Sequence, residues 1–257
     1  MARAHDVLTF AGSSDADPSR ERELADAFAA RGVDGLIIAP LQRRPELLLR
    51  DREAGTALVF VDRPPRFIDA DAVVSDNAGG ARAAVEHLLR AGHRRIAFLG
   101  DRPSVFTAAE RRRGYQEALA DGGIETQDAL ERVGLIDSEP ARLATLDVLL
   151  AGDPPTALFT AQNLITIGAV RALRELRLQH EVSLVGFDDV MLVDMVKPGT
   201  TVVTQDPHAL GRHAAELLFS RLDGYDGESR LVVMPTALVT RGSGEIEPAG
   251  ARPVSEA

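Results

Sequence analysis

The chain has 257 residues, of which 45% are hydrophobic and 26% are charged, and it contains no cysteine. This composition is typical of a soluble globular protein with a proper core, and it excludes global disorder, disulfides, thiol catalysis and thiolate metal sites. The 29 basic and 39 acidic residues give a net charge of −10, which does not provide the positive surface that non-specific binding to duplex DNA requires.

The lengths of the apolar runs indicate the cellular location of the protein. No apolar stretch approaches the roughly 20 residues that a membrane helix needs. Residues 1–6 do not form the apolar core of a signal peptide. We therefore expect a cytoplasmic protein that does not bind membranes.

Short runs rich in Val, Ile, Leu and Phe recur along the chain and predict strands. Most of them are apolar throughout rather than alternating, which is typical of strands buried on both faces of a parallel sheet. In chain order they are Val7–Phe10, Gly35–Ala39, Ala57–Val61, Ala72–Val74, Arg95–Leu99, Val133–Ile136, Thr156–Thr160 and Val182–Phe187.

Amphipathic segments between these runs predict the crossover helices. The first begins at Asp17-Pro18, an N-cap followed by a proline at the first helical position. The second is capped by Asn77 and ended by Gly92. Three more are predicted at Ser138–Leu150, Asn163–Leu176 and His208–Leu222. The alternation of strands and helices predicts an open, doubly wound α/β fold with parallel strands.

Two sheets are expected rather than one, because one strand-rich segment ends near residues 72–76 and a second alternating series begins there. No low-complexity linker separates the two series, which favours several chain crossings at a hinge. The tail Glu245–Ala257 is mostly polar or small, contains two prolines, and is predicted to be disordered.

Polar residues directly follow several of the apolar runs. In open α/β sheets ligands bind beyond the carboxyl ends of the strands, so these residues are the candidates for a binding site. Carboxylates and amides beside an arginine suit a polyhydroxylated ligand, because a carboxylate accepts hydroxyl hydrogen bonds and a guanidinium donates them in a fixed geometry. The alternative is that each residue only forms a turn or caps a helix. The candidates are Asp62-Arg63, Asp76-Asn77, Asp101-Arg102, Gln162-Asn163 and Asp188-Asp189.

Motifs of common enzyme classes are absent. The sequence contains no P-loop, no nucleophile elbow and no dinucleotide-binding glycine turn. His87 and His93 flank a predicted helix end, where a structural role is favoured. Asp188 and Asp189 would point to opposite faces of an extended strand, so ligand binding by one is favoured over acid–base catalysis by both. We expect no enzymatic activity, no cofactor and no bound metal.

Several segments together carry a resemblance to a known family. The most specific are Asp-Asn-Ala-Gly-Gly-Ala at 76–81, Glu-His-Leu-Leu-Arg-Ala-Gly-His-Arg-Arg-Ile-Ala-Phe-Leu-Gly at 86–100, and Val182–Asp189. Further matches follow the family order, at Val33–Ile38, Ala109–Tyr115, Gly168–Leu173 and Val239–Ser243. Over roughly residues 5–244 the chain resembles the core of the LacI/GalR family of bacterial transcriptional regulators.

The resemblance implies a core shaped like a periplasmic sugar-binding protein. Two α/β subdomains would be joined by three crossings, with a small sugar-like effector in the cleft between them. Residues 1–76 plus 205–229 would form the N-terminal subdomain, and residues 77–204 plus 230–244 the C-terminal one. Effector binding would shift the population between two subdomain orientations, and a dimer would pass that shift to operator DNA.

The same resemblance implies a set of effector contacts. Arg111 would be the main donor, and Asp62 and Asp188 would accept hydroxyl groups. Gln162-Asn163 stands where the family usually has Asn-Asp, so the effector's identity does not transfer. The expected ligand-binding residues are Asp62, Arg111, Gln162, Asn163, Asp188 and Gln205.

The resemblance starts at the second strand of the family's core. Family members carry a helix-turn-helix head, a hinge helix and a first strand and helix ahead of that point. We therefore expect a truncated chain that does not bind operator DNA alone. In the full-length protein, expected to be a homodimer, the head would make the DNA contact.

Two other classes of protein remain as alternatives. A solute receptor for transport or chemotaxis shares the implied fold, but the absent signal segment and the Gly-His-Arg-Arg-Ile run at 92–96 favour a regulator. A sugar-processing enzyme on a similar core is less favoured, because no nucleophile, metal cluster or phosphate loop is found.

Overall fold

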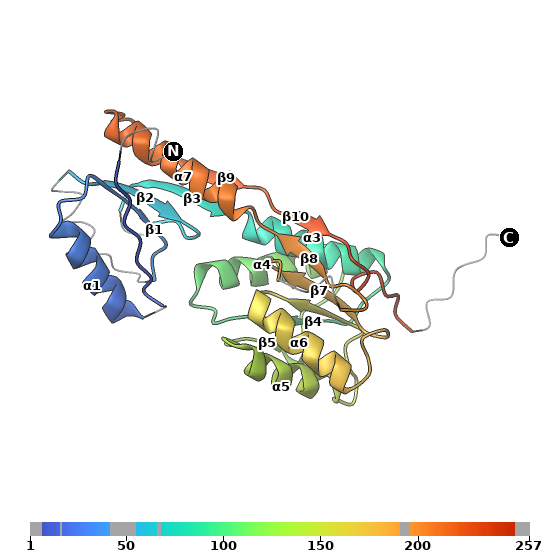
Figure 1. Cartoon of the computed structure of the whole chain (residues 1–257). Helices are drawn as coiled ribbons and strands as arrows, with labels where there is room; N and C mark the ends of the chain where they lie inside the picture. The colour runs from blue at the N-terminus through green and yellow to red at the C-terminus, as the bar shows by residue number, and fades with distance from the viewer. Residues whose placement is uncertain (1–6, 16, 42–54, 66–67, 191–195, 250–257) are drawn as a thin grey trace. The chain divides into compact units, whose positions relative to one another are not determined.

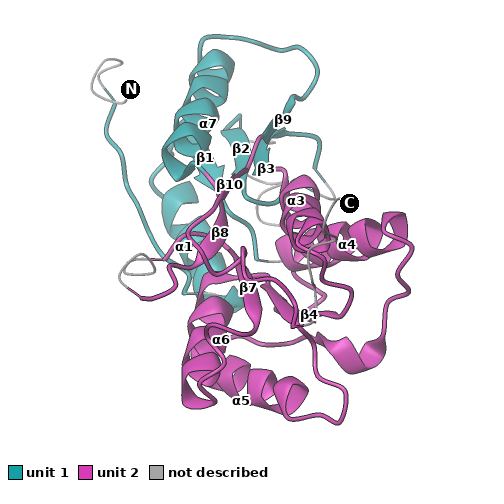
Figure 2. Ribbon diagram, turned by 90° about the vertical axis from the view of Figure 1, so that its right-hand side faces the viewer, with its two compact units in different colours: residues 1–75, 206–234 teal, residues 76–205, 235–257 magenta. Residues whose placement is uncertain are grey.

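The computed structural model describes residues 7–15, 17–41, 55–65, 68–190 and 196–249 (Figure 1). The chain divides into two compact units: unit 1 comprises Met1–Ser75 and Asp206–Met234, and unit 2 comprises Asp76–Gln205 and Pro235–Ala257 (Figure 2). The chain therefore passes from one unit to the other three times, after residues 75, 205 and 234. The predicted α/β fold with two sheets and three crossings is confirmed.

Unit 1 is a four-stranded parallel sheet with strand order β1-β2-β3-β9. Its elements are α1 (Pro18–Ala29), β1 (Gly35–Ile38), β2 (Ala57–Val61), β3 (Asp71–Ser75), α7 (Pro207–Leu222) and β9 (Leu231–Met234). One face of the sheet packs on α7, where Val59 and Val73 meet Ala214 and Leu217. The other face carries a second buried cluster around Phe60.

Unit 2 is built on a six-stranded sheet with strand order β10-β8-β7-β6-β4-β5, in which β10 alone among these strands is antiparallel to its neighbour. None of the helices in the described part of the chain is long and apolar enough to cross a membrane. The elements of unit 2 are α3 (Asn77–Arg90), β4 (Ile96–Leu99), α4 (Phe106–Asp121), η2 (Asp128–Leu130), β5 (Glu131–Arg132), α5 (Ser138–Leu149), β6 (Ala157–Thr160), α6 (Asn163–Glu175), β7 (Ser183–Phe187), β8 (Thr201–Thr204) and β10 (Ala237–Val239).

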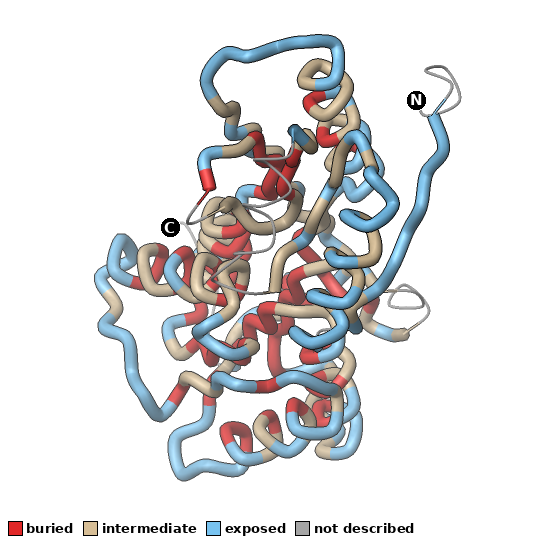
Figure 3. The backbone as a smooth tube through the Cα atoms, turned by 90° about the vertical axis from the view of Figure 1, so that its left-hand side faces the viewer, coloured by how far each residue is buried: buried red, intermediate tan, exposed pale blue. Residues whose placement is uncertain are grey.

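Helices cover both faces of the unit 2 sheet. Residues of α3 and α4 pack with Phe98, Phe159 and Phe187 on one face, and residues of α5 and α6 pack with Leu99 and Leu158 on the other. Every residue of β4, β6 and β7 is buried, and Figure 3 draws the buried residues of the chain in red. This double burial is the reason that the strand sequences are apolar throughout, as predicted.

Two predicted strands and one predicted cap are wrong. Val7–Phe10 pairs with no described strand, and Leu8 is 88% exposed, because apolar residues form a stable strand only when a neighbour takes their backbone hydrogen bonds. Val133–Ile136 is not a strand; the ladder with β4 is already complete at β5. The N-cap of α3 is Asp76, whose side chain accepts a hydrogen bond from the Gly79 backbone N–H, and Asn77 is the first helical residue.

Six elements are not predicted from the sequence: α4, η2, β5, β8, β9 and β10. Helix α4 has no side-chain N-cap, and its buried face includes Arg111 and Gly114, which break the apolar periodicity. The other five are four strands and one 3₁₀ helix of two to four residues each, too short for a clear pattern.

The boundaries of the two units also differ from the predicted ones. Residues 230–234 lie in unit 1 rather than in the C-terminal subdomain, because β9 pairs with β3. Asp76 and Gln205 lie in unit 2 rather than in the N-terminal subdomain. Asp76 caps a helix of unit 2, and Gln205 donates to Asp188.

The predicted disorder of the tail Glu245–Ala257 is wrong for its described part, residues 245–249. The Glu245 carboxylate accepts hydrogen bonds from the Gly242 N–H and the Thr201 hydroxyl, and it pairs with His87. The ring of His93, which is fully buried, bonds the Ile246 carbonyl at 2.7 Å. These contacts hold the segment on unit 2; residues 250–257 lie outside the described part.

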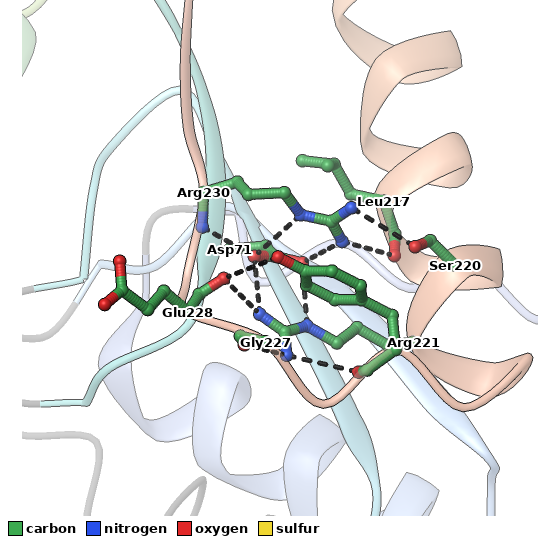
Figure 4. Close-up of polar contacts among 8 residues, drawn as sticks. Asp71, Leu217, Ser220, Arg221, Gly227, Glu228 and Arg230 are labelled. Carbon is green, nitrogen blue, oxygen red and sulfur yellow. Dashed lines mark hydrogen bonds and ion pairs between the residues drawn. The ribbon is translucent and has the colours of Figure 1, made fainter.

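A buried carboxylate organises unit 1 (Figure 4). Asp71, at the start of β3, is fully buried and accepts hydrogen bonds from the side chains of both Arg221 and Arg230. The Arg230 backbone N–H also donates to it, at 2.7 Å, and both guanidinium groups lie over the ring of Tyr225. Burial alone would raise the pKa of Asp71, but the hydrogen bonds from Arg221 and Arg230 outweigh it and hold that pKa well below its usual value.

Replacing Asp71 by Asn should lower the free energy of unfolding by about 3 kcal/mol at pH 7, because two arginines then lose their buried counter-charge. The depressed pKa means that the wild type gains this stability above about pH 4 and loses it as the pH falls below that value. Urea denaturation from pH 7 down to pH 3 measures both effects. The variant should show a flatter pH dependence.

Asp147→Asn is the matched control, because Asp147 pairs with Arg132 at a side-chain exposure of 66%. An exposed pair of this kind contributes about 0.5 kcal/mol or less. Equal losses in the two variants would contradict the role given to Asp71.

Candidate functional site

Arg111 is the centre of a polar cluster in unit 2. It lies on α4 and is only 5% exposed. Its guanidinium group reaches Ala161, which follows β6, and Phe187 and Asp188, which end and follow β7. The cluster therefore lies at the carboxyl ends of two neighbouring parallel strands, where the strand-end rule predicts a binding site.

The guanidinium group is held on three sides. Its Nε donates to Asn77 Oδ1 at 2.8 Å, and its Nη1 donates to the Ala161 carbonyl and to Asp188 Oδ2, each at 2.9 Å. Its Cζ lies 3.7 Å from the centroid of the Phe187 ring, which is a cation–π contact. A guanidinium has five N–H donors. Three of the five are engaged, and no described residue accepts a hydrogen bond from Nη2.

Asp188 is the carboxylate of the cluster. Its Oδ2 accepts from Arg111 and its Oδ1 from the Gln205 amide, while its side chain remains 24% exposed. Each oxygen keeps further capacity to accept a hydrogen bond, because a carboxylate oxygen has two lone pairs. The site thus offers donors and acceptors side by side.

Both predicted carboxylates adopt an uncommon backbone conformation. Asp188 has φ +70° and Asp62 has φ +67°, each directly after a strand. The left-handed region is costly for residues other than glycine, and such conformations cluster at functional sites. Asp62 lies in unit 1, where its neighbour Arg63 contacts it at 3.3 Å and also donates to the Pro40 carbonyl.

Gln162 and Asn163 use their side-chain oxygens to begin α6. Gln162 is the N-cap, and its Oε1 accepts from the backbone N–H groups of Leu164 and Ile165. Asn163 Oδ1 also accepts from Leu164 N–H, at 2.7 Å. These bonds support the interpretation that both side-chain oxygens cap the helix. The amide N–H groups of the two side chains are then the part that can bind a ligand.

The other strand-end candidates have local partners. Asp101 pairs with Arg102, which follows it. Asp189 forms two hydrogen bonds with Arg241, which hold its pKa below the usual value. Asp188 and Asp189 therefore face different partners, as predicted from their adjacency, and of the two only Asp188 belongs to the cluster.

Of the six predicted contacts, the structure brings Arg111, Asp188 and Gln205 directly together. Asn77 and Phe187 also belong to the cluster but are not among the predicted contacts. The sequence offers one signal for Phe187, which is its position directly before the predicted contact Asp188. Nothing in the sequence indicates that Asn77 bonds an arginine 34 residues away.

The described histidines and carboxylates are predicted to have structural or ligand-binding roles. Within the described ranges no group of three or more His, Asp or Glu side chains could hold a metal ion. His93 is bonded to the Thr156 hydroxyl as well as to the tail. Burial lowers its pKa, and the bond to the Ile246 carbonyl partly opposes that shift. This arrangement supports the structural role predicted for His93.

Comparison with known proteins identifies relatives over most of the chain. The periplasmic-binding-protein-like domain family matches residues 85–244. The transcriptional regulator CelR of Thermobifida fusca is 32% identical over 225 residues, which cover 86% of this chain and 66% of CelR. The transcriptional repressor PurR of Vibrio atlanticus is 27% identical, with 86% and 67% covered. The chain thus spans about two thirds of the length of these curated relatives.

Solved structures agree with this result. A CelR–cellobiose complex superposes with a TM-score of 0.80 at 31% identity, covering 89% of this chain and 71% of that one. A regulatory protein of the LacI family from Chloroflexus aggregans gives a TM-score of 0.81 at 28% identity, covering 93% and 85%.

Replacing Gly114 by Ala should disturb the cluster through the packing of α4 on α3. A Cβ at this position would lie 2.2 Å from the Ala78 carbonyl oxygen, so one helix must shift beside the Asn77–Arg111 bond. Overpacking of this kind costs about 2 kcal/mol. Urea denaturation measures the loss.

Gly211→Ala is the control, since Gly211 lies in α7 and a Cβ there would meet nothing within 4 Å. This variant should be stabilised by about 0.5–1 kcal/mol through helix propensity alone. A Gly114 variant that is as stable as the Gly211 variant would show that α3 and α4 do not need this close approach.

Proposed function

Because the chain belongs to the periplasmic-binding-protein-like domain family and, within it, to the LacI family of transcriptional regulators, we propose that it is the effector-sensing core of a bacterial transcriptional repressor. Its effector is a small, polar, sugar-like metabolite. Arg111, Asp188 and Gln205 bind it, with the amide groups of Gln162 and Asn163 as further donors. Asp62 of unit 1 is a sixth contact, which the resemblance alone suggests.

The observation that carries the proposal is the unsatisfied part of the Arg111 guanidinium. Arg111 Nη2 is not among the buried polar side-chain atoms that lack a partner in the described part of the chain, so this nitrogen is accessible to solvent and open to a ligand. Nη2 keeps two N–H donors with no acceptor among the described residues, next to a partly exposed carboxylate. A ligand hydroxyl can accept from Nη2 while a neighbouring hydroxyl donates to Asp188, which is the pattern of adjacent hydroxyls in a sugar.

The charges of the cluster favour a neutral ligand. Arg111 is already paired with Asp188 at 2.9 Å, so a bound anion would meet an arginine whose charge is balanced and a carboxylate that repels it. Hydroxyl groups carry no charge and both donate and accept. We therefore assign the effector to the neutral polyhydroxylated compounds rather than to sugar acids or sugar phosphates.

The relatives support the same chemistry. CelR is named as a transcriptional regulator, and its solved complex contains cellobiose, a neutral sugar. CelR, PurR and the probable regulator EndR of Paenibacillus polymyxa are all named as regulators rather than as transport receptors or enzymes. This favours the regulator over the receptor alternative, and we propose that the chain has no catalytic activity.

The regulatory step is a population shift that effector binding drives. An effector changes such an equilibrium only through different affinities for the two states. The full-length protein acts as a cytoplasmic homodimer, and its operator contact is made by a segment other than this acidic chain. The net charge of −10 supports that division of labour.

A thermal-shift screen of neutral sugars, with cellobiose and ribose included, should find a compound that stabilises the chain. At one hundred times its dissociation constant the compound should add about 2.7 kcal/mol. Arg111→Met and Asp188→Ala should each abolish the shift, because each removes one side of the hydroxyl-binding pair. Asp189→Asn, which breaks only the bond to Arg241, should keep it. Equal stabilisation of all variants, or of none including the wild type, counts against the proposal.

The preference for neutral ligands should reverse in Asp188→Asn. The wild type should bind the neutral sugar that the screen finds at least about tenfold more tightly than the sugar acid made by oxidising one of its carbons to a carboxylate, and this ratio corresponds to about 1.4 kcal/mol. In the variant the Arg111 charge is no longer balanced, so the ratio should fall below one. Calorimetric titration measures both affinities, and a wild type that prefers the acid would refute the assignment of a neutral ligand.

A further inference from the structure

Asn77 is a buried polar residue that is a strand-end candidate but not one of the six expected ligand contacts. It is 3% exposed, and its Oδ1 accepts from Arg111 Nε at 2.8 Å. We propose that Asn77 is a positioning residue that fixes the plane of the Arg111 guanidinium, so that Nη2 presents its two N–H groups to the effector. The role in effector binding rests on the proposed function, whereas the effect of Asn77 on the orientation of Arg111 does not.

The start of α3 does not need the Asn77 side-chain oxygen. Asp76 is the N-cap, and its Oδ1 accepts from Gly79 N–H at 2.8 Å. Asn77, the first helical residue, therefore does not take the capping role that its residue type usually has. Its oxygen is instead directed at a residue of the neighbouring helix α4.

The geometry gives this hydrogen bond a specific effect. The Ala161 carbonyl and Asp188 both bind Nη1, so together they hold one corner of the guanidinium. A guanidinium that is held only at Nη1 and by its covalent bond to Cδ can still turn about the line through these two points. The bond from Nε to Asn77 is a second anchor in the same plane, and the Phe187 ring supports the face. With both anchors in place, the direction of Nη2 is determined.

The neutral amide also preserves the charge balance of the site. A carboxylate at position 77 would give Arg111 a second negative partner beside Asp188. An apolar side chain would leave Nε buried without an acceptor, which is costly. Asn supplies an acceptor without a charge, as the assignment of a neutral effector requires.

The arginine Nε–H signals in a proton–nitrogen correlation spectrum test the geometry without any effector. Arg111→Lys identifies the Arg111 signal by its absence. In Asn77→Leu and Asn77→Ala the Nε–H should exchange with water roughly tenfold faster than in the wild type, as expected for loss of a hydrogen bond to a charged group. In Asn77→Asp, which keeps an acceptor at the same place, exchange should remain slow.

Thr145→Val is the control for a general loss of stability. Thr145 is buried in α5 of the same unit and donates to the Ala141 carbonyl at 2.7 Å, away from the residues of the cluster. This variant should leave the Arg111 signal unchanged. An unchanged exchange rate in both Asn77→Leu and Asn77→Ala would overturn the proposal, as would equal acceleration in Thr145→Val.

Titration with cellobiose, or with the neutral sugar that the screen finds, tests the consequence for binding. Asn77→Leu should weaken binding roughly tenfold, as expected when a donor to the ligand loses its orientation, while Thr145→Val should not change it. Unchanged affinity in Asn77→Leu would overturn the positioning role. A wild type that binds no neutral sugar would refute the proposed function, and the exchange measurement would still decide the role of Asn77.

Discussion

The buried guanidinium of Arg111 is the constraint on which the arrangement of unit 2 depends. Burying a permanent charge is costly unless the fold supplies partners for it. Here they come from four elements: the start of α3, the ends of β6 and β7, and the residue after β8 that holds Asp188 in turn. The close approach of α3 and α4 at Gly114 brings the first of these partners within reach. The geometry of the cluster therefore depends on how α3 packs against α4.

The Asp71 cluster shows what distinguishes a structural ion pair from a candidate site. In unit 1, all five N–H donors of Arg221 have protein acceptors: Asp71 and three backbone carbonyls. Asp71 is fully buried and receives five hydrogen bonds. Neither Asp71 nor Arg221 keeps a hydrogen-bonding position for a ligand. In unit 2, Arg111 keeps two donors and Asp188 keeps part of its exposure, so the same residue types leave capacity for binding.

The sequence predicts those elements and residues whose positions depend on burial and on neighbours along the chain. Uninterrupted apolar runs identify the strands buried on both faces, and Asp17-Pro18 identifies the start of α1, where the Asp17 side chain does accept from Ser19 N–H. Helix α4 is missed because its buried face is occupied by Arg111 and Gly114 as well as apolar residues. The strand-end rule finds Asp188, because proximity to a strand end is a property of sequence order. It also places Asn77 among the candidates, but it does not predict the bond between Asn77 and Arg111, because that contact depends on how two helices pack.

Gln205 connects the cluster to the course of the chain. It is the last residue of unit 2, and the next residue, Asp206, is the first of unit 1. The Gln205 amide donates to Asp188 Oδ1, while Asp206 caps α7 by accepting from Ala209 N–H at 2.8 Å. Because a carboxylate oxygen has two lone pairs, Asp188 Oδ1 can accept from a hydroxyl group beside the Gln205 amide. The segment after β8 therefore leads directly from a residue bonded to Asp188 to the N-cap of α7.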